Sequence, residues 1–273
     1  MLKEKSMVNC IVTGAAGRMG RRIMEILIET EGADVTGATE KAGHDAVGMD
    51  VGDFLGLGKK GSVIAGDLAK VIKKGDVVID FTFPEVSIAH AGAAAKAGKA
   101  IVIGSTGFSE AQVKEIKKLA KKVPIVLAPN MSVGVNLLLK VLSQVASVLG
   151  EDYDIDIVET HHRHKKDAPS GTALKMAQVV AEARGRDLAK VGVFERHGNI
   201  GERRRGEIGV QTLRVGDVVG EHTVIFGTMG ERIEITHKAS SRDVFARGAV
   251  RAAMWVVGKK PGLYDMSDVL GIK

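Results

Sequence analysis

A glycine-rich turn at residues 14–20 constrains the fold of this chain more than any other feature. It follows a short apolar segment, residues 8–12, that is typical of a buried strand, and apolar side chains then recur at helical spacing from Met19 to Leu27. A strand that ends at the start of a helix in this way presents free N–H groups and the positive end of the helix dipole to a pyrophosphate. The spacing is G-x-x-G-x-x-G rather than the commoner G-x-G-x-x-G, so an ordinary strand-to-helix turn stays an alternative.

An acidic residue downstream supports the nucleotide-binding interpretation. Glu40 directly follows a second expected strand, residues 35–39, and stands twenty residues beyond Gly20. A carboxylate in this position meets the adenosine ribose hydroxyls of a dinucleotide. Glu40 favours NADH, whereas the neighbouring Lys41 can balance the 2′-phosphate of NADPH. The sequence therefore predicts NADH or NADPH as cofactor and leaves the choice open.

Strands and helices alternate through the first half of the chain. Further short apolar segments occupy residues 63–65, 77–80, 100–103 and 125–128. Pro84 begins one intervening helix and Gly98 ends it, while Ser109 and Gln112 form the pattern of a capping box for another. This alternation predicts an α/β fold with a Rossmann-like, doubly wound parallel sheet.

Two polar turns follow strands of this predicted sheet, at residues 104–107 and 128–131. Ligands of doubly wound sheets bind beyond the carboxyl ends of the strands. Small and amide side chains in these turns suit a nicotinamide ribose and carboxamide. Ordinary turn chemistry explains each segment equally well when it is taken alone.

The pattern changes after Pro129. A long apolar helix is expected at residues 135–149, a strand from about Tyr153, a second helix at residues 170–184 and a last helix at residues 241–255. Three further strands, expected at residues 208–214, 218–226 and 233–238, are separated by turn glycines that favour antiparallel pairing. We predict a dinucleotide-binding domain at residues 1–130, completed by residues 241–273, and an α+β substrate-binding and oligomerisation domain with a mixed sheet at residues 131–240.

The small second sheet has few helices near it in the sequence, and these can cover one face. We expect the other face to carry an exposed apolar patch, which usually marks an interface. The residues expected in this patch are Val210, Thr212, Val224 and Phe226.

Composition excludes several classes of protein. The chain is 45% hydrophobic and 26% charged, which is typical of a globular protein, and its single cysteine, Cys10, excludes a disulfide framework. A net charge of +6 is compatible with nucleic-acid binding, but the acids are interspersed and aromatic residues make up only 4%. The longest apolar runs are short for a membrane span. We expect a soluble, cytoplasmic protein with no nucleic-acid or membrane partner.

The densest polar stretch, residues 159–172, contains three of the eight histidines, His161, His162 and His164. A zinc site would use His161 and His164, but no second cluster offers a third ligand. A solvated basic loop is a second alternative. A site for an anionic substrate explains more of the residues, because Lys165 and the histidines supply charge and protons near neutral pH. The Ser-Gly-Thr sequence at residues 170–172 begins a helix and suits a carboxylate.

These motifs resemble the 4-hydroxy-tetrahydrodipicolinate reductase family, the dihydrodipicolinate reductases of bacterial lysine and diaminopimelate synthesis. The resemblance is strongest at residues 159–173, with their His-His pair, their lysine and the run Asp-Ala-Pro-Ser-Gly-Thr-Ala. It covers nearly the whole chain in order, and Ser105, where a threonine is common, is a conservative variation. The other matching segments are residues 14–20, 104–108, 130–136, 220–223 and 235–242.

The resemblance implies a homotetramer, assembled through the sheet of the second domain, that reduces a cyclic unsaturated imine dicarboxylate with NADH or NADPH, the hydroxylated substrate losing water. No metal is expected, because no second cluster offers a third ligand. The resemblance also implies that His161 is the proton donor and acceptor and that Lys165 is a second proton donor. The residues implied to hold the substrate carboxylates are His162, Lys165, Ser170, Gly171 and Thr172. The residues implied to line the cofactor are Gly14, Ala15, Ala16, Gly17, Arg18, Met19, Glu40, Lys41, Gly104, Ser105, Thr106, Ala128, Pro129, Asn130 and Met131.

Three alternatives remain at this point. The chain could be another dinucleotide-dependent reductase of an amino acid or its imine. A nucleotide sensor without catalytic activity would have no need for His161 and Lys165 together. A nucleic-acid binder would show a clustered basic face and a steep salt dependence of binding.

Overall fold

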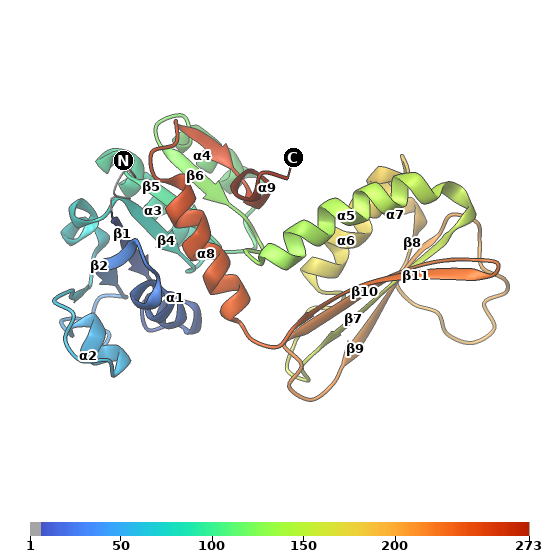
Figure 1. The fold of residues 1–273 in the computed structure, drawn as a ribbon, viewed down its shortest axis with the longest axis horizontal. Helices are drawn as coiled ribbons and strands as arrows, with labels where there is room; N and C mark the ends of the chain where they lie inside the picture. The colour runs from blue at the N-terminus through green and yellow to red at the C-terminus, as the bar shows by residue number, and fades with distance from the viewer. Residues whose placement is uncertain (1–6, 273) are drawn as a thin grey trace. The chain divides into compact units, whose positions relative to one another are not determined.

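The computed structural model describes residues 7–272, which form two compact units (Figure 1). The first unit runs to Val133 and resumes at Asp243. The second unit comprises Gly134–Arg242. The last long helix of the chain therefore returns to the first unit.

The first unit contains a parallel sheet, as the alternation of strands and helices predicts. Within residues 7–272 the sheet has seven strands in the order β12-β6-β5-β4-β1-β2-β3. The order reverses at β1, which pairs in parallel with both β2 and β4, so the switch point of the doubly wound fold lies beyond the carboxyl ends of β1 and β4. The strands are β1 (Val8–Thr13), β2 (Ala33–Thr39), β3 (Ile64–Ala65), β4 (Val77–Asp80), β5 (Ala100–Ile103), β6 (Pro124–Leu127) and β12 (Gly262–Tyr264).

Helices cover both faces of this sheet, because successive side chains of each strand point to opposite sides. Cys10 and Val12 of β1 belong to one apolar core together with α1 and α8, while Ile11 belongs to a second core together with α3 and α4. The predicted helix ends are confirmed at Gly98, which has a φ of 66°, and at the capping box that begins α4. The helices are α1 (Arg18–Glu29), α2 (Val51–Leu55), η1 (Leu68–Lys70), η2 (Ile72–Lys74), α3 (Pro84–Ala97), α4 (Glu110–Leu119), α8 (Asp243–Val256) and α9 (Met266–Leu270).

The second unit contains the predicted mixed sheet, with the strand order β11-β10-β7-β9-β8. Strand β10 pairs antiparallel with β7 and with β11, whereas β9 pairs in parallel with β7 and with β8. The antiparallel expectation therefore holds for β10 and β11 but is wrong for β9. The strands are β7 (Asp154–His161), β8 (Gly192–Val193), β9 (Ile208–Arg214), β10 (Gly220–Thr228) and β11 (Glu231–Ala239), and the helices are α5 (Val133–Leu149), η3 (Gly150–Asp152), α6 (Gly171–Ala183) and α7 (Leu188–Val191).

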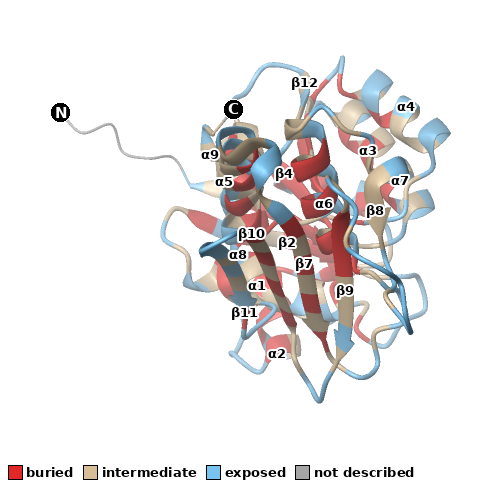
Figure 2. Cartoon of the chain, turned by 90° about the vertical axis from the view of Figure 1, so that its right-hand side faces the viewer, coloured by how far each residue is buried: buried red, intermediate tan, exposed pale blue. Residues whose placement is uncertain are grey.

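The prediction that Val210, Val224 and Phe226 form part of an exposed apolar patch on this sheet is wrong. These residues are fully buried in a core that includes residues of α5 and α6. The register explains their position, because Ile157 of β7 lies opposite both Val210 and Val224, on the face that the helices cover. Figure 2 shows the resulting alternation of buried and half-buried positions along β7 and β10. The open face of the sheet carries the intervening residues.

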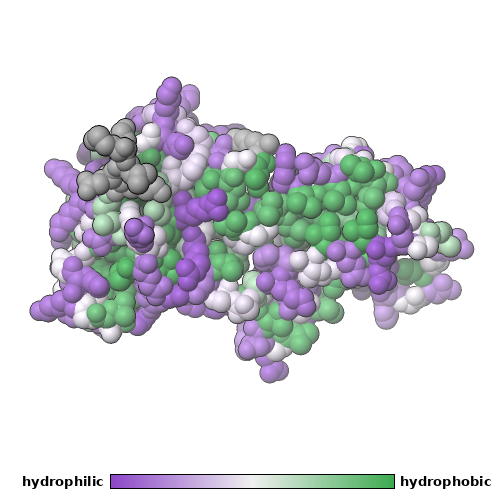
Figure 3. Space-filling model, in the orientation of Figure 1, coloured by the Kyte–Doolittle hydropathy of each residue, from purple (hydrophilic) through white to green (hydrophobic). Residues whose placement is uncertain are grey.

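Helix α5 is unusually apolar. Residues Val133–Asp152 are long and apolar enough, by length and composition alone, to cross a membrane. One side of α5, which includes Leu138 and Leu142, packs in the core of the second unit, and the other side exposes Leu137 and Val148. Figure 3 shows apolar side chains gathered over α5. The helix therefore supplies core contacts to its unit and also presents an apolar outer face.

Candidate active site

The glycine turn has the backbone geometry that a pyrophosphate site requires. Gly14 has a φ of 67°, a conformation that glycine adopts without strain. A Cβ atom on Gly20 would lie 2.0 Å from the carbonyl oxygen of Gly14, so only glycine allows α1 to pack this closely on the turn. Gly17 is the N-cap of α1, and in the described chain no side chain caps this helix start. The turn and the beginning of α1 therefore fit a dinucleotide phosphate group.

The structure brings Glu40 to the glycine turn. The N–H of Ala16 donates to Oε2 of Glu40 at 2.8 Å, and the N–H of Lys41 donates to Oε1 at 2.9 Å. The carboxylate is half-buried at the end of β2, while Lys41 and Arg18 are exposed. These contacts place the carboxylate of Glu40 at the glycine turn, where the sequence predicts the adenosine end of a dinucleotide.

The other predicted cofactor residues lie at the same edge of the sheet, but some of them have buried side chains and can offer a ligand mainly backbone groups. Residues 104–106 follow β5 and residues 128–131 follow β6, and these two strands are neighbours in the sheet. Ala128 and Met131 are buried, so their side chains belong to the core. Asn130 accepts a hydrogen bond from the N–H of Ser132 at 2.9 Å. Ala128 and Met131 can therefore offer a ligand mainly their backbone.

Sequence reasoning missed residues that follow β4, the strand at the switch point. The ring of Phe81 lies 2.2 Å from the position of a Cβ atom built on Gly104. The Cγ2 atom of Thr82 lies 3.1 Å from the corresponding position on Gly14. Both residues therefore pack against glycines of the predicted cofactor site. Their place after β4 is the signal that could have identified them.

Asp80, the last residue of β4, is a fully buried carboxylate. It accepts hydrogen bonds from the hydroxyls of Thr13 at 2.9 Å, Ser87 at 2.6 Å and Ser105 at 3.1 Å, and it pairs with Nδ1 of His90 at 2.5 Å. Burial opposes ionisation, but the hydrogen bond and charge of His90, aided by Ser87, outweigh it and lower the pKa of Asp80 to about 2. One carboxylate therefore ties together the ends of β1, β4 and β5.

In the second unit, His161 ends β7 on the face that the helices cover. Its Nδ1 atom is hydrogen-bonded to the carboxylate of Glu159, which is fully buried. Burial lowers the pKa of His161, and the nearby positive charges of Lys165 and Arg214 act in the same direction, whereas the hydrogen bond and charge of Glu159 raise it. The net effect is a pKa below the ordinary value for histidine. His161 therefore has the environment of a titrating group rather than a solvated surface residue.

Lys165 and His162 lie in the turn after β7. The Nζ atom of Lys165 pairs with Oδ1 of Asp167 at 2.9 Å, and 21% of the lysine side chain is exposed. The ring of His162 lies 6.3 Å from that of His164. Within residues 7–272 the buried Nδ1 atom of His162 has no hydrogen-bond partner.

The start of α6 provides hydrogen-bond donors. Ser170 is the N-cap of this helix, and its hydroxyl accepts from the N–H of Ala173 at 3.2 Å. A Cβ atom built on Gly171 would meet no atom of the described chain within 4 Å, so the first turn borders open space. The helix N-terminus is therefore open to an anion at the exposed Gly171.

His222 of β10 is a further site residue that sequence reasoning did not single out. Its Nε2 atom lies 3.1 Å from the hydroxyl of Ser170, and its ring lies 5.1 Å from that of His161 in an edge-to-face arrangement. Burial and the nearby His161 lower the pKa of His222 to about 4, so it is neutral near pH 7. The segment at residues 220–223 carried this residue, but only the pairing of β10 with β7 brings it to His161.

Two other possibilities for a site find less support. In the part of the chain that the structure describes, no three metal-ligating side chains lie together, and Nδ1 of His161 is already bonded to Glu159.

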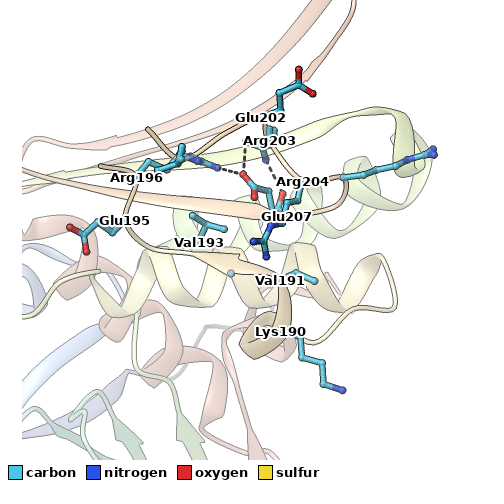
Figure 4. A pocket seen from close by; sticks show the side chains of 12 residues that line it. Lys190, Val191, Val193, Glu195, Arg196, Glu202, Arg203, Arg204 and Glu207 are labelled. Carbon is cyan, nitrogen blue, oxygen red and sulfur yellow. Dashed lines mark hydrogen bonds and ion pairs between the residues drawn. The ribbon is translucent and has the colours of Figure 1, made fainter. Parts of the chain in front are cut away.

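A cavity of about 360 Å³ lies among residues 190–207 (Figure 4). Two of its arginines are engaged in ion pairs, since Arg196 pairs with Asp156 at 2.6 Å and Arg203 pairs with Asp154 at 3.1 Å. These pairs fasten the long loop before β9 to β7.

Comparisons with known proteins agree with the two-unit organisation. The family model described as "Dihydrodipicolinate reductase, N-terminus" matches residues 8–131, and the model described as "Dihydrodipicolinate reductase, C-terminus" matches residues 134–270. The chain is 61% identical over 267 residues to the 4-hydroxy-tetrahydrodipicolinate reductase of Syntrophus aciditrophicus (strain SB), covering 98% of this chain and 100% of the relative. It is 58% identical to the protein of that name from Geotalea uraniireducens (strain Rf4), with the same coverage.

Solved structures show the same architecture. The dipicolinate-bound dihydrodipicolinate reductase from Paenisporosarcina sp. TG-14 superimposes with a TM-score of 0.77 at 25% identity, covering 96% of this chain and 99% of that one. The amine dehydrogenase from Mycobacterium smegmatis superimposes with a TM-score of 0.60 at 14% identity, covering 94% of each chain. At that identity the second likeness concerns the fold alone.

Proposed function

The chain belongs to the dihydrodipicolinate reductase family, and from this premise we propose how its residues carry out the reaction. The reaction is the NAD(P)H-dependent reduction of 4-hydroxy-tetrahydrodipicolinate to tetrahydrodipicolinate, in lysine and diaminopimelate biosynthesis. The observation that carries the proposal is the buried pair of His161 and Glu159 beside the open start of α6. This arrangement joins a proton donor to an anion site within one unit.

We assign the cofactor to the first unit. The glycine turn would hold the pyrophosphate, Glu40 the adenosine ribose, and the ends of β4, β5 and β6 the nicotinamide half. The reduced nicotinamide supplies the hydride. The hydrogen bonds of Asp80 fix Thr13 and Ser105 at this edge of the sheet. They would therefore preorganise the cofactor site. The first unit would therefore supply the hydride donor of the reaction.

We assign the substrate to the second unit. His162, Lys165 and residues 170–172 would bind its two carboxylates, because they combine cations, a hydroxyl and helix N–H groups. The 4-hydroxy substrate would first lose water to give a conjugated imine. Addition of hydride to this imine leaves an electron-rich enamine that must take up one proton. His161 would donate that proton from Nε2, and Lys165 would be the second donor. The substrate class is a cyclic dicarboxylate.

The choice between NADH and NADPH can be tested at Lys41. We expect Lys41→Ala to weaken NADPH binding about tenfold and to change NADH binding little, because the lysine would contact the additional 2′-phosphate of NADPH. Titration of each cofactor by fluorescence measures both affinities. Lys114→Ala, at an exposed lysine of α4, is the matched control. Equal losses of affinity for NADH and NADPH would show that Lys41 does not contact the 2′-phosphate.

We propose that four copies assemble through the open face of the second unit's sheet. This face carries Val158 and Ile225, which are half-buried, and Gln211, whose buried Nε2 atom has no hydrogen-bond partner in the described chain. A second copy packed on this face would cover the apolar side chains and supply a partner to Gln211. Val210 and Phe226 are buried on the opposite face of the sheet, so they would take no part in this interface.

Light scattering is expected to give a mass about four times that of the chain, as a closed symmetric tetramer requires. Val158→Lys should reduce this mass, because a charge would be buried in the interface. Val148→Lys makes the same exchange at an exposed residue of α5 and should leave the mass unchanged. A parent chain that is monomeric at micromolar concentration would contradict the assembly.

The experiment that tests the function directly supplies the chain with enzymatically generated substrate and each reduced cofactor. Oxidation of the cofactor, followed by its absorbance, is expected only when substrate is present. Absence of oxidation with both NADH and NADPH would overturn the proposal. The proposed location is the cytoplasm, where reduced nicotinamide dinucleotides are available to a biosynthetic enzyme.

A further inference from the structure

We propose that Glu159 is a positioning residue that holds the proton donor His161 and the start of α6 in one arrangement. The inference rests on the proposed function, because it assigns His161 a proton to deliver. It adds a residue that would touch neither substrate nor cofactor and would act through two groups that do.

The carboxylate of Glu159 accepts hydrogen bonds from residues of several elements. Its carboxylate is fully buried and accepts a hydrogen bond from the N–H of Ser170 at 2.9 Å, in addition to the bond with His161. Arg214 donates to it from both terminal guanidinium nitrogens, Nη1 and Nη2, with each N–O distance at 3.0 Å. The hydroxyl of Thr212 donates to the same carboxylate at 3.3 Å. A single side chain therefore joins β7, β9 and the first residue before α6.

The charge of Glu159 is stabilised in this position. Burial raises the pKa of the carboxyl group, but the hydrogen bonds from Arg214, His161 and the Ser170 N–H outweigh burial and hold the pKa below the ordinary value. Glu159 is therefore ionised near pH 7 and can only accept hydrogen bonds. The partner atom Nδ1 of His161 must then carry a proton.

This arrangement directs the exchangeable proton of His161 to Nε2. Gly220 of β10 lies next to His161, and a Cβ atom on Gly220 would come within 3.0 Å of Nε2. The absence of a side chain at residue 220 therefore keeps the Nε2 side of the ring uncrowded. Glu159 fixes the ring from one side, and Gly220 leaves room on the other.

The groups that face His161 from the surrounding elements explain why a carboxylate is needed. Lys165 in the turn after β7 and Arg214 on β9 disfavour the imidazolium form, as does burial. His222 on β10 is neutral, and His237 on β11 lies beyond it, with the two rings 6.5 Å apart. The hydrogen bond and the charge of Glu159 act in the opposite direction and raise the pKa of His161. Without the charge of Glu159, less imidazolium would be present near neutral pH to donate a proton.

The test compares the pH dependence of turnover in the full-length parent chain and in Glu159→Gln. Loss of the carboxylate lowers the pKa of His161, so the fall in turnover on the alkaline side is expected to move to lower pH by about one unit. Turnover near pH 7 should fall about tenfold, because one unit changes the imidazolium fraction by that factor. Glu159→Asp, which keeps the charge, should retain the parent's alkaline limb. Glu182→Gln, at an exposed glutamate of α6, is the matched control for the charge change.

A second measurement does not depend on turnover. The ¹⁵N resonances of the His161 ring report which nitrogen carries the proton in the neutral form. In the parent chain we expect the proton on Nδ1, and a proton on Nε2 alone would overturn the proposal even if Glu159→Gln does not fold. An alkaline limb that is unchanged in a folded Glu159→Gln variant would overturn it as well. Failure of the parent chain to reduce the substrate would instead refute the proposed function, and the ring resonances would still decide the role of Glu159.

Discussion

His161→Ala and Lys165→Ala are each expected to lower turnover by about 10²–10⁴, the usual effect of losing a proton donor. His161 is the buried ring that Glu159 holds, and Lys165 is the neighbouring ammonium that lowers its pKa. Binding of NADH should stay near that of the parent chain, because the residues assigned to the cofactor belong to the first unit. Steady-state kinetics with saturating cofactor measures the loss, and fluorescence titration measures cofactor binding.

Matched controls come from the same turn. His164→Ala removes an exposed histidine, and Lys166→Ala removes an exposed lysine, so neither should change turnover by more than a few-fold. Full turnover in His161→Ala or in Lys165→Ala would show that the residue concerned is not a proton donor. Weakened cofactor binding in either variant would instead indicate a structural effect.

Asp80→Ala is expected to lower the free energy of unfolding by about 3–5 kcal/mol, because each of several buried donors left without an acceptor costs about 1–3 kcal/mol. The substitution leaves His90 without its partner and removes the acceptor of Thr13, Ser87 and Ser105. Urea denaturation of the full chain measures the loss. Asp67→Ala, at the exposed N-cap of η1, should cost about 1 kcal/mol. Equal losses in the two variants would contradict the role of the buried network.

The same carboxylate gives a pH signature. The folded-state pKa of Asp80 is about 2, below that of an unfolded aspartate, so its contribution to stability is fully present above the unfolded pKa near 4. It is lost as the pH falls from about 4 to about 2, and it amounts to about 2 kcal/mol. Asp80→Asn should lack this part of the acid destabilisation. A parent chain and variant whose stabilities fall in parallel below pH 4 would refute the assignment.

The sequence predicted the helices and strands themselves better than the pairing and register of the strands in the second sheet. The glycine turn, the capping box at Ser109 and the αL glycine at Gly98 are local signals, because each depends on residues within one turn of a helix. The covered face of the second sheet could not be predicted, since it depends on which strands pair and in which register. Phe226 is buried because it lies opposite Ile155, a relation that no local pattern contains.

The same limit applies to the candidate site. His161 and Lys165 are identified by a dense polar segment, and that segment is contiguous in the sequence. Glu159 belongs to it too, but its role depends on Arg214, which β9 brings beside β7 in parallel. His222 arrives through the antiparallel pairing of β10 with β7. Contacts between distant residues therefore supplied what the motifs could not.

Transfer of label from the cofactor tests the central claim most directly. Nicotinamide dinucleotide that carries deuterium at the transferred position would be mixed with the parent chain and freshly generated 4-hydroxy-tetrahydrodipicolinate, and the product would be examined by mass spectrometry. We predict tetrahydrodipicolinate with one deuterium on the ring, formed at the rate of cofactor oxidation. Unlabelled tetrahydrodipicolinate, or oxidation of the cofactor without this product, would contradict the reaction assigned to the chain.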